Sequence, residues 1–275
     1  MISFGFRGHD FPDNEVGTLV QRCRELNVPH LQLALKKSFP DLIKDGRFSP
    51  GLARHIKTEL ERGNVAVSVL GCYINPVHPE EPVRQAEITR FCEMLKYAKY
   101  MGADMVGTET GSILQQSEDN HTEAVYQVFL QSMRQIVACA EKLGVMVGVE
   151  GVTVHTIHNP QIMKRFLDDI DSPNVSVIFD AVNLINAENA AQQEKMMDEA
   201  FALFGERIAV IHVKDFVVKE GKMQGVPLGE GNLNLDHLFA WCKENKPYIH
   251  AVVEGIPPEK VEQARRFLQE RYDNA

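Results

Sequence analysis

Four residues whose side chains bind metal ions stand at the ends of four apolar segments in the second half of the chain. The segments are VMVGVE, VSVIFD, IAVIHVK and IHAVVE, and the residues are, in the same order, Glu150, Asp180, His212 and Glu254. Three carboxylates and one imidazole suit Mn²⁺, Mg²⁺, Co²⁺ or Zn²⁺, and the set leaves the choice among these ions open. Because no cysteine belongs to the set, a structural zinc site is disfavoured.

The elements that must position these side chains follow an alternating pattern. Short runs rich in Val and Ile predict strands, several of them apolar throughout, as in parallel sheets covered by helices. These strands are expected at 2–6, 30–35, 65–70, 103–108, 145–150, 175–180, 208–214 and 249–254. Amphipathic segments between them predict helices at about 15–26, 50–62, 82–100, 122–143, 160–170, 191–204, 236–244 and 258–271.

Eight strands that alternate with eight helices indicate a (β/α)₈ TIM barrel of the α/β class, formed as one domain over residues 1–275. An open doubly wound sheet is the rival architecture. It usually carries a glycine-rich phosphate loop after its first strand, whereas the first strand here is followed by Arg7-Gly8-His9-Asp10.

A barrel would bring the four metal-competent residues to one point, because active sites of this fold lie at the C-terminal ends of the strands. Alternation supports the set, since alternate residues of a strand share a face. Glu150 shares its face with Met146 and Gly148, which suit a barrel interior. His250 lies deeper on the face of Glu254 and is expected to be a hydrogen-bonded core histidine.

Composition narrows the classes of partner and the compartment. The formal charge of −9 argues against a protein that binds nucleic-acid backbones, although a local pocket can still be basic. The five scattered cysteines make a disulfide framework unexpected and favour a reducing compartment. The N-terminus lacks the pattern of a signal peptide, and no apolar window is long enough for a membrane span. A cytoplasmic location is therefore expected.

Five phrases resemble the sugar phosphate isomerase/epimerase superfamily, the xylose isomerase-like barrels. They are VGVEGV, VIFDAVN, IHVKDF, the GEG at 229–231, and VVEG. This group includes ketose 3-epimerases, hydroxypyruvate isomerase, inosose dehydratase and endonuclease IV. The resemblance implies one divalent ion, with manganese among the candidates, held by Glu150, Asp180, His212 and Glu254. It also implies a small carbohydrate substrate, no nucleic-acid or membrane partner, and a homo-oligomer as the expected assembly.

The implied chemistry is isomerisation or epimerisation of a small sugar, sugar phosphate or sugar acid. A metal that chelates a carbonyl and a neighbouring hydroxyl makes the adjacent C–H acidic and stabilises an enediolate. Glu150 and Glu254 would then act as catalytic residues, one removing a proton and the other delivering one.

Several further residues are expected to bind the substrate. Cys72 follows the third strand and Glu109 the fourth, although a small buried residue and a helix cap are equally good readings of these two. His9 lies at the end of the first strand, and His155 lies just beyond the fifth. Lys214 stands two residues after His212 and therefore faces inward, where it would bind a phosphate or carboxylate or pair with Glu254.

Two departures from the ketose epimerases widen the choice of substrate. Those enzymes carry a histidine three residues after the metal aspartate, where this chain has Asn183, which we expect to contact the substrate. They also carry an arginine six residues after the metal histidine, where this chain has Val218.

Three other functions stay open at this point. A metal-dependent dehydratase uses the same enolate chemistry but expels a hydroxyl group. An apurinic-site endonuclease needs a larger set of His and Asp ligands and a basic surface. A non-catalytic sugar-binding barrel would bind its ligand without proton exchange.

Overall fold

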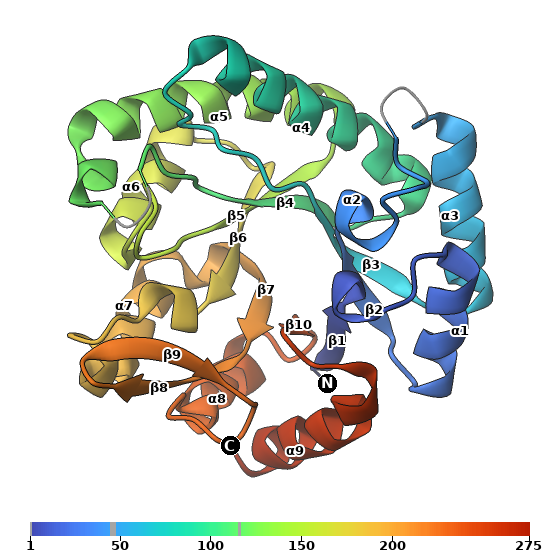
Figure 1. Cartoon of the computed structure of the whole chain (residues 1–275). Coiled ribbons are helices and arrows are strands. Elements are labelled where there is room, and N and C mark those ends of the chain that lie inside the picture. The colour runs from blue at the N-terminus through green and yellow to red at the C-terminus, as the bar shows by residue number, and fades with distance from the viewer. Residues whose placement is uncertain (1, 45–47, 115–116) are drawn as a thin grey trace.

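The computed structural model describes residues 2–44, 48–114 and 117–275. Eight parallel strands close into a barrel in the order β1-β10-β7-β6-β5-β4-β3-β2 (Figure 1). They are β1 (Ser3–Arg7), β2 (His30–Leu33), β3 (Ala66–Gly71), β4 (Met105–Glu109), β5 (Met146–Glu150), β6 (Val175–Asp180), β7 (Ile208–Val213) and β10 (His250–Val253). Each overlaps one predicted strand, so the predicted TIM-barrel fold is confirmed.

Helices form a ring outside the strands (Figure 1). They are α1 (Val16–Glu25), α3 (Pro50–Arg62), α4 (Glu81–Met101), α5 (Glu123–Leu143), α6 (Pro160–Ile170), α7 (Gln193–Phe204), α8 (Leu235–Asn245) and α9 (Val261–Asn274). The predicted cap at the start of α3 is present, because Ser49 Oγ accepts the Leu52 N–H at 3.2 Å. Gly102 and Gly144 end α4 and α5 in the left-handed conformation.

One helix and one hairpin of two strands were not predicted. The short helix α2 (Leu35–Ser38) follows β2 directly, and an antiparallel hairpin of β8 (Asp215–Lys219) and β9 (Lys222–Val226) follows β7. The hairpin turns through Glu220 and Gly221, both at positive φ, as two-residue hairpin loops often require. Six short 3₁₀ segments complete the described elements: Gly8–Asp10, Glu118–His121, Val182–Leu184, Ala190–Gln192, Gly205–Arg207 and Pro258–Lys260.

A small apolar cluster fills the barrel interior, on the N-terminal side of the residues that end the strands. Its members are Val69, Met105, Ile178, Val210 and Val252. The same parity that puts these side chains inside carries Asp180, two residues beyond Ile178, to the C-terminal mouth. A Cβ at Gly148 would lie 2.8 Å from Ile178 Cδ1, so glycine leaves room for this packing.

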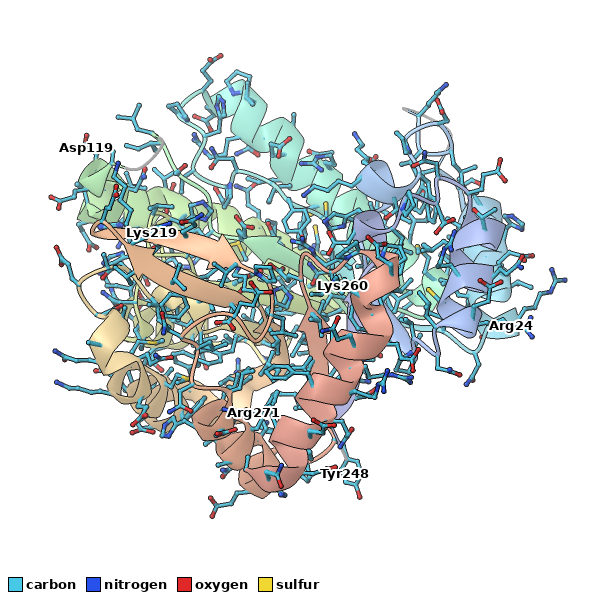
Figure 2. All side chains as sticks on the ribbon, turned by 60° about the horizontal axis from the view of Figure 1, so that its bottom comes forward. Arg24, Asp119, Lys219, Tyr248, Lys260 and Arg271 are labelled. Carbon is cyan, nitrogen blue, oxygen red and sulfur yellow. The ribbon has the colours of Figure 1, made fainter. Side chains whose placement is uncertain are left out.

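The two ends of the barrel are separated in space. In Figure 2, Asp119 and Lys219, which follow barrel strands, lie in the upper part of the view, whereas Tyr248, which precedes β10, lies near the bottom. The upper end is therefore the C-terminal end, where sites of this fold are built. Within the described ranges, none of the helices has the length and apolarity needed to cross a membrane.

Candidate active site

Four neighbouring strands bring the candidate metal ligands together at the C-terminal end. Glu150 is the last residue of β5, Asp180 is the last residue of β6, and Glu254 follows β10 directly. The barrel register pairs Asp180 with His212 and pairs His212 with Val252, two residues before Glu254. Glu150 pairs with Ile178, two residues before Asp180, so strand pairing brings the four residues to the same end of the barrel.

The four side chains meet at the Nδ1 atom of His212. This nitrogen lies 3.2 Å from Glu150 Oε1 and 3.3 Å from Glu254 Oε1. Asp180 Oδ2 is 3.9 Å away. Ligand atoms of Glu150, Asp180 and His212 all lie within 4.8 Å of one another, and all three residues are buried.

The other ring nitrogen of His212 has a separate partner. Nε2 lies 2.8 Å from Gln32 Oε1, and the Gln32 amide nitrogen donates to the Tyr73 hydroxyl at 2.6 Å. Gln32 and His212 are both buried. Gln32 was not predicted as a site residue, although a glutamine inside the apolar run HLQLAL could have indicated a buried polar contact.

Two cationic side chains and an amide surround the carboxylates. Lys214 Nζ lies 2.7 Å from Asp180 Oδ2 and 3.3 Å from Glu254 Oε2, and it donates to Asn183 Oδ1 at 2.7 Å. The Asn183 amide nitrogen donates to Glu150 Oε1 at 2.6 Å. Arg7 Nη1 lies 3.4 Å from Glu254 Oε2. The pairing of Lys214 with Glu254, one of the two alternatives that the sequence left open, is present.

The charges of this cluster shift its titration. Burial opposes the protonated form of His212, but the Glu150, Glu254 and Asp180 carboxylates outweigh it and raise its pKa to about 9. Burial also raises the pKa of Asp180. For Glu254 the burial effect is overcome by His212, Lys214 and Arg7, which lower its pKa to about 2. The protein therefore holds carboxylates of unequal basicity in one place.

An open polar cavity of about 250 Å³ lies against this cluster. Its lining consists of Arg7, Lys37, Tyr73, Glu109, Glu150, Val152, His155, Asn183, Lys214 and Glu254. Four of the expected substrate residues line it: Glu109, His155, Asn183 and Lys214. Glu109 Oε2 lies 3.6 Å from His155 Nδ1, and burial together with the nearby Glu150 raises the pKa of Glu109 to about 7.

The other two expected substrate residues do not line the cavity. Cys72 is buried with its thiol 3.9 Å from the Arg90 guanidinium, and burial raises its pKa to about 11. His9 lies in the 3₁₀ turn after β1, half-buried, with its pKa lowered by burial and by Arg7. Their contact with a substrate stays a prediction. Val218 lies in β8, is 40% exposed, and does not line the cavity either.

Lys37 and Tyr73 are lining residues that sequence reasoning did not single out. Lys37 lies in α2 with its ammonium 4.3 Å from the centre of the Tyr73 ring. Lys37 follows β2 and Tyr73 follows β3, both at the C-terminal end of the barrel. Residues that follow barrel strands line the active sites of this fold, so the same rule could have indicated Lys37 and Tyr73.

The residues present fit a divalent cation. The converging donors are carboxylate oxygens and one imidazole nitrogen, without sulfur, which is the set that Mg²⁺, Mn²⁺, Co²⁺ and catalytic Zn²⁺ accept. Three carboxylates, on Glu150, Asp180 and Glu254, converge on His212 and raise the pKa of its imidazole, so this position attracts positive charge. An added cation would compensate this concentration of buried negative charge.

The sequence profile described as a xylose isomerase-like TIM barrel matches residues 20–271. An uncharacterised protein of Methanocaldococcus jannaschii is 25% identical over 178 residues, which cover 62% of this chain and 57% of that protein. The alignment thus spans little more than half of the relative's length.

Solved structures share the fold over nearly the whole chain. A D-tagatose 3-epimerase-like protein superposes with a TM-score of 0.77 at 17% identity, covering 99% of this chain and 97% of the other. The IOLI protein with a bound zinc atom gives a TM-score of 0.75 at 16% identity, covering 99% and 98%. At these identities the likeness establishes the fold.

Proposed function

Because the chain belongs to the xylose isomerase-like TIM barrel family, we propose that it is a divalent-metal-dependent isomerase or epimerase of a small sugar, sugar phosphate or sugar acid. Glu150, Asp180, His212 and Glu254 would hold the metal ion, and Glu150 and Glu254 would transfer protons. The similar D-tagatose 3-epimerase-like protein and the zinc-bound IOLI protein support this class of activity by analogy of fold.

The observation that carries the proposal is the convergence of two glutamates on one imidazole nitrogen. Glu150 and Glu254 come from strands that are not neighbours in the barrel, yet each reaches within 3.3 Å of His212 Nδ1. Both also line the same cavity. Two carboxylates that border one substrate-sized cavity can address the same carbon atom, which epimerisation requires.

A bound divalent ion would polarise a substrate carbonyl and stabilise the negative charge that develops on its oxygen. The proton transfers would be carried out by Glu150 and Glu254. One glutamate removes the proton from the carbon next to the carbonyl, and the other returns a proton to a substrate atom. For epimerisation the returned proton reaches the opposite face of the same carbon.

Residues around the glutamates would set their roles. His212, Lys214 and Arg7 favour the ionised form of Glu254 and lower its pKa, so Glu254 begins the cycle as a carboxylate that can accept a proton. Asn183 donates to Glu150 and so fixes the orientation of that carboxylate. Glu109, with its pKa raised to about 7, can donate a hydrogen bond to a substrate hydroxyl near neutral pH.

Proton exchange with solvent tests this function directly. The Mn²⁺-loaded protein would be incubated in D₂O with a panel of ketoses, sugar phosphates, sugar acids and inososes, and the products would be read by NMR and mass spectrometry. We expect deuterium at a carbon next to a carbonyl for at least one class. Substrate turnover without any such exchange would contradict proton transfer as the mechanism.

A dehydratase is the second candidate, favoured by the position of Lys214. Its ammonium lies 3.3 Å from Glu254 and lines the cavity, where it could protonate a departing hydroxyl group while Glu254 removes the proton. The same panel separates the two functions, because only a dehydratase yields a product lighter by one water molecule.

A further inference from the structure

We propose that Gln32 is a positioning residue that selects which nitrogen of His212 binds the metal ion. This inference rests on the proposed metal centre. Gln32 Oε1 can only accept a hydrogen bond, and it lies 2.8 Å from His212 Nε2. The contact therefore requires a proton on Nε2. In the neutral ring, the lone pair is then left on Nδ1, the atom that faces the carboxylates.

Tyr73 lies at the other end of the Gln32 amide and accepts its N–H group. The amide nitrogen of Gln32 donates to the Tyr73 hydroxyl at 2.6 Å, so the carbonyl end points at His212. A rotated amide would present N–H groups to Nε2 and favour the other tautomer. Tyr73, which follows β3 and is half-buried, thus forms a chain of hydrogen bonds with the buried Gln32 of β2 and the buried His212 of the metal centre.

Three variants test the chain through metal affinity. Partners of a ligating histidine typically contribute 10–100-fold to metal binding. We expect Gln32→Leu to weaken Mn²⁺ binding by roughly tenfold or more. Gln32→Glu keeps an acceptor beside Nε2 and should retain affinity close to that of the wild type. Tyr73→Phe removes the hydroxyl that bonds to the Gln32 amide and should weaken Mn²⁺ binding by a smaller factor. Thermal unfolding of the metal-free variants verifies that each is folded.

A spectroscopic measurement identifies the bound nitrogen. In ¹⁵N-histidine protein loaded with ¹¹³Cd²⁺, the metal couples through one bond only to the nitrogen that binds it. We expect this coupling at Nδ1 of one histidine in the wild type and a weakened or redistributed signal in Gln32→Leu. Coupling at Nε2, or unchanged affinity in Gln32→Leu, overturns the role of Gln32. A wild-type protein that binds no metal overturns the metal centre itself, which is a separate result.

A second observation lies outside the barrel. Cys92 on α4 and Cys139 on α5 place their sulfur atoms 2.7 Å apart, and both residues are partly accessible. That separation is only about 0.7 Å longer than a disulfide bond. The other three cysteines, Cys23, Cys72 and Cys242, are buried. We infer that Cys92 and Cys139 form an oxidation site that links the two helices.

The reaction needs a two-electron oxidant such as hydrogen peroxide. One thiol is oxidised to a sulfenic acid as peroxide is reduced to water, and the second thiol then displaces a second water molecule to form the S–S bond. Burial and the neighbouring Cys139 raise the pKa of Cys92 to about 12, which favours the thiol over the reactive thiolate and so slows the reaction with peroxide. In a reducing compartment both groups stay thiols.

Peptide mapping tests this site. After peroxide treatment and alkylation under denaturing conditions, we expect a mass lower by two hydrogens and a peptide that joins residues 92 and 139. Cys92→Ser and Cys139→Ser should each abolish the linked peptide. The melting temperature should rise on oxidation of the wild type alone, because the bond closes a loop of 46 intervening residues. Complete alkylation of both thiols after oxidation overturns the inference.

Discussion

Lys214 places its ammonium nitrogen 2.7 Å from Oδ2 of Asp180, a carboxylate of the candidate metal centre. Asp180 is fully buried, and Lys214 is the cation nearest to it. A divalent ion that binds the same carboxylate would therefore feel the repulsion of this ammonium group. The contact couples metal binding to the charge of a residue that also lines the cavity.

Removal of that charge should strengthen metal binding. We expect Lys214→Met to bind Mn²⁺ about tenfold more tightly, or ~1.4 kcal/mol, because the repulsion is lost. Titration calorimetry measures the change. Lys219→Met, the same substitution at the exposed end of β8, should leave the affinity unchanged. Unchanged or weaker binding by Lys214→Met would show that Lys214 does not compete with the ion.

The two glutamates should each be essential for turnover. Glu150→Gln and Glu254→Gln keep the shape of the side chain but remove the base, so we expect rates to fall by roughly 10²–10⁴-fold. Deuterium incorporation in D₂O measures the loss. Glu259→Gln, which alters an exposed glutamate a few residues beyond Glu254, is the matched control and should retain full activity. A folded Glu254→Gln protein with normal exchange would remove Glu254 from the proposed mechanism.

Asp215 should anchor the segment that follows the hairpin. Its two carboxylate oxygens accept backbone N–H groups from Phe216, Gly229, Gly231 and Leu233. Asp215→Ala leaves these donors unsatisfied, and we expect the free energy of unfolding to fall by about 2–4 kcal/mol. Urea denaturation gives the value, and Asp41→Ala, at a carboxylate that is 94% exposed, should change it little. Equal stability of the two variants would contradict the anchoring role.

His30 should make the protein less stable in acid. The ring is buried, bonds to Ser68 Oγ and the Ser3 carbonyl, and stacks on His250, whose own partner is Asp104. Burial and the neighbouring His250 lower the pKa of His30 to about 4. The unfolded chain binds this proton near the ordinary value of 6.5, so acid favours unfolding.

The contribution of His30 should be complete above pH ~6.5 and lost as the pH falls toward 4, a total of roughly 3 kcal/mol. Urea denaturation at several pH values between 7 and 4.5 measures the slope. His30→Gln should lower stability at pH 7 but flatten that slope. If the variant and the wild type lose stability in parallel, another group is responsible.

The barrel and the metal-competent residues could be predicted because both depend on local sequence. Apolar runs such as VSVIFD indicate a buried strand, and the polar residue that ends the run indicates where the strand reaches the C-terminal end of the barrel. Barrel closure then determines which strand ends are neighbours. That rule placed Asp180 and His212 in one predicted set, and the register pairs them across β6 and β7.

The residues that were missed depend on tertiary contacts. Gln32 contacts His212 only because barrel closure brings β2 and β7 to opposite sides of one site, and no short sequence motif encodes that contact. The hairpin β8–β9 was missed because β9 is largely exposed and the apolar run of β8 spans only 216–218, directly after the seventh barrel strand. The Glu220-Gly221 turn was the available signal. Cys92 and Cys139 lie 47 residues apart, so their contact follows from the packing of α4 on α5.

The central claim is that one divalent ion binds where Glu150, Asp180, His212 and Glu254 meet, and metal titration tests it most directly. Mn²⁺ would be titrated into chelator-treated protein and counted by calorimetry or electron paramagnetic resonance. We predict one ion per wild-type chain, and binding weakened by orders of magnitude in Asp180→Asn, whose side chain is nearly isosteric. A wild-type chain that binds no Mn²⁺, Mg²⁺, Co²⁺ or Zn²⁺, or an Asp180→Asn variant that binds as well, would contradict the account.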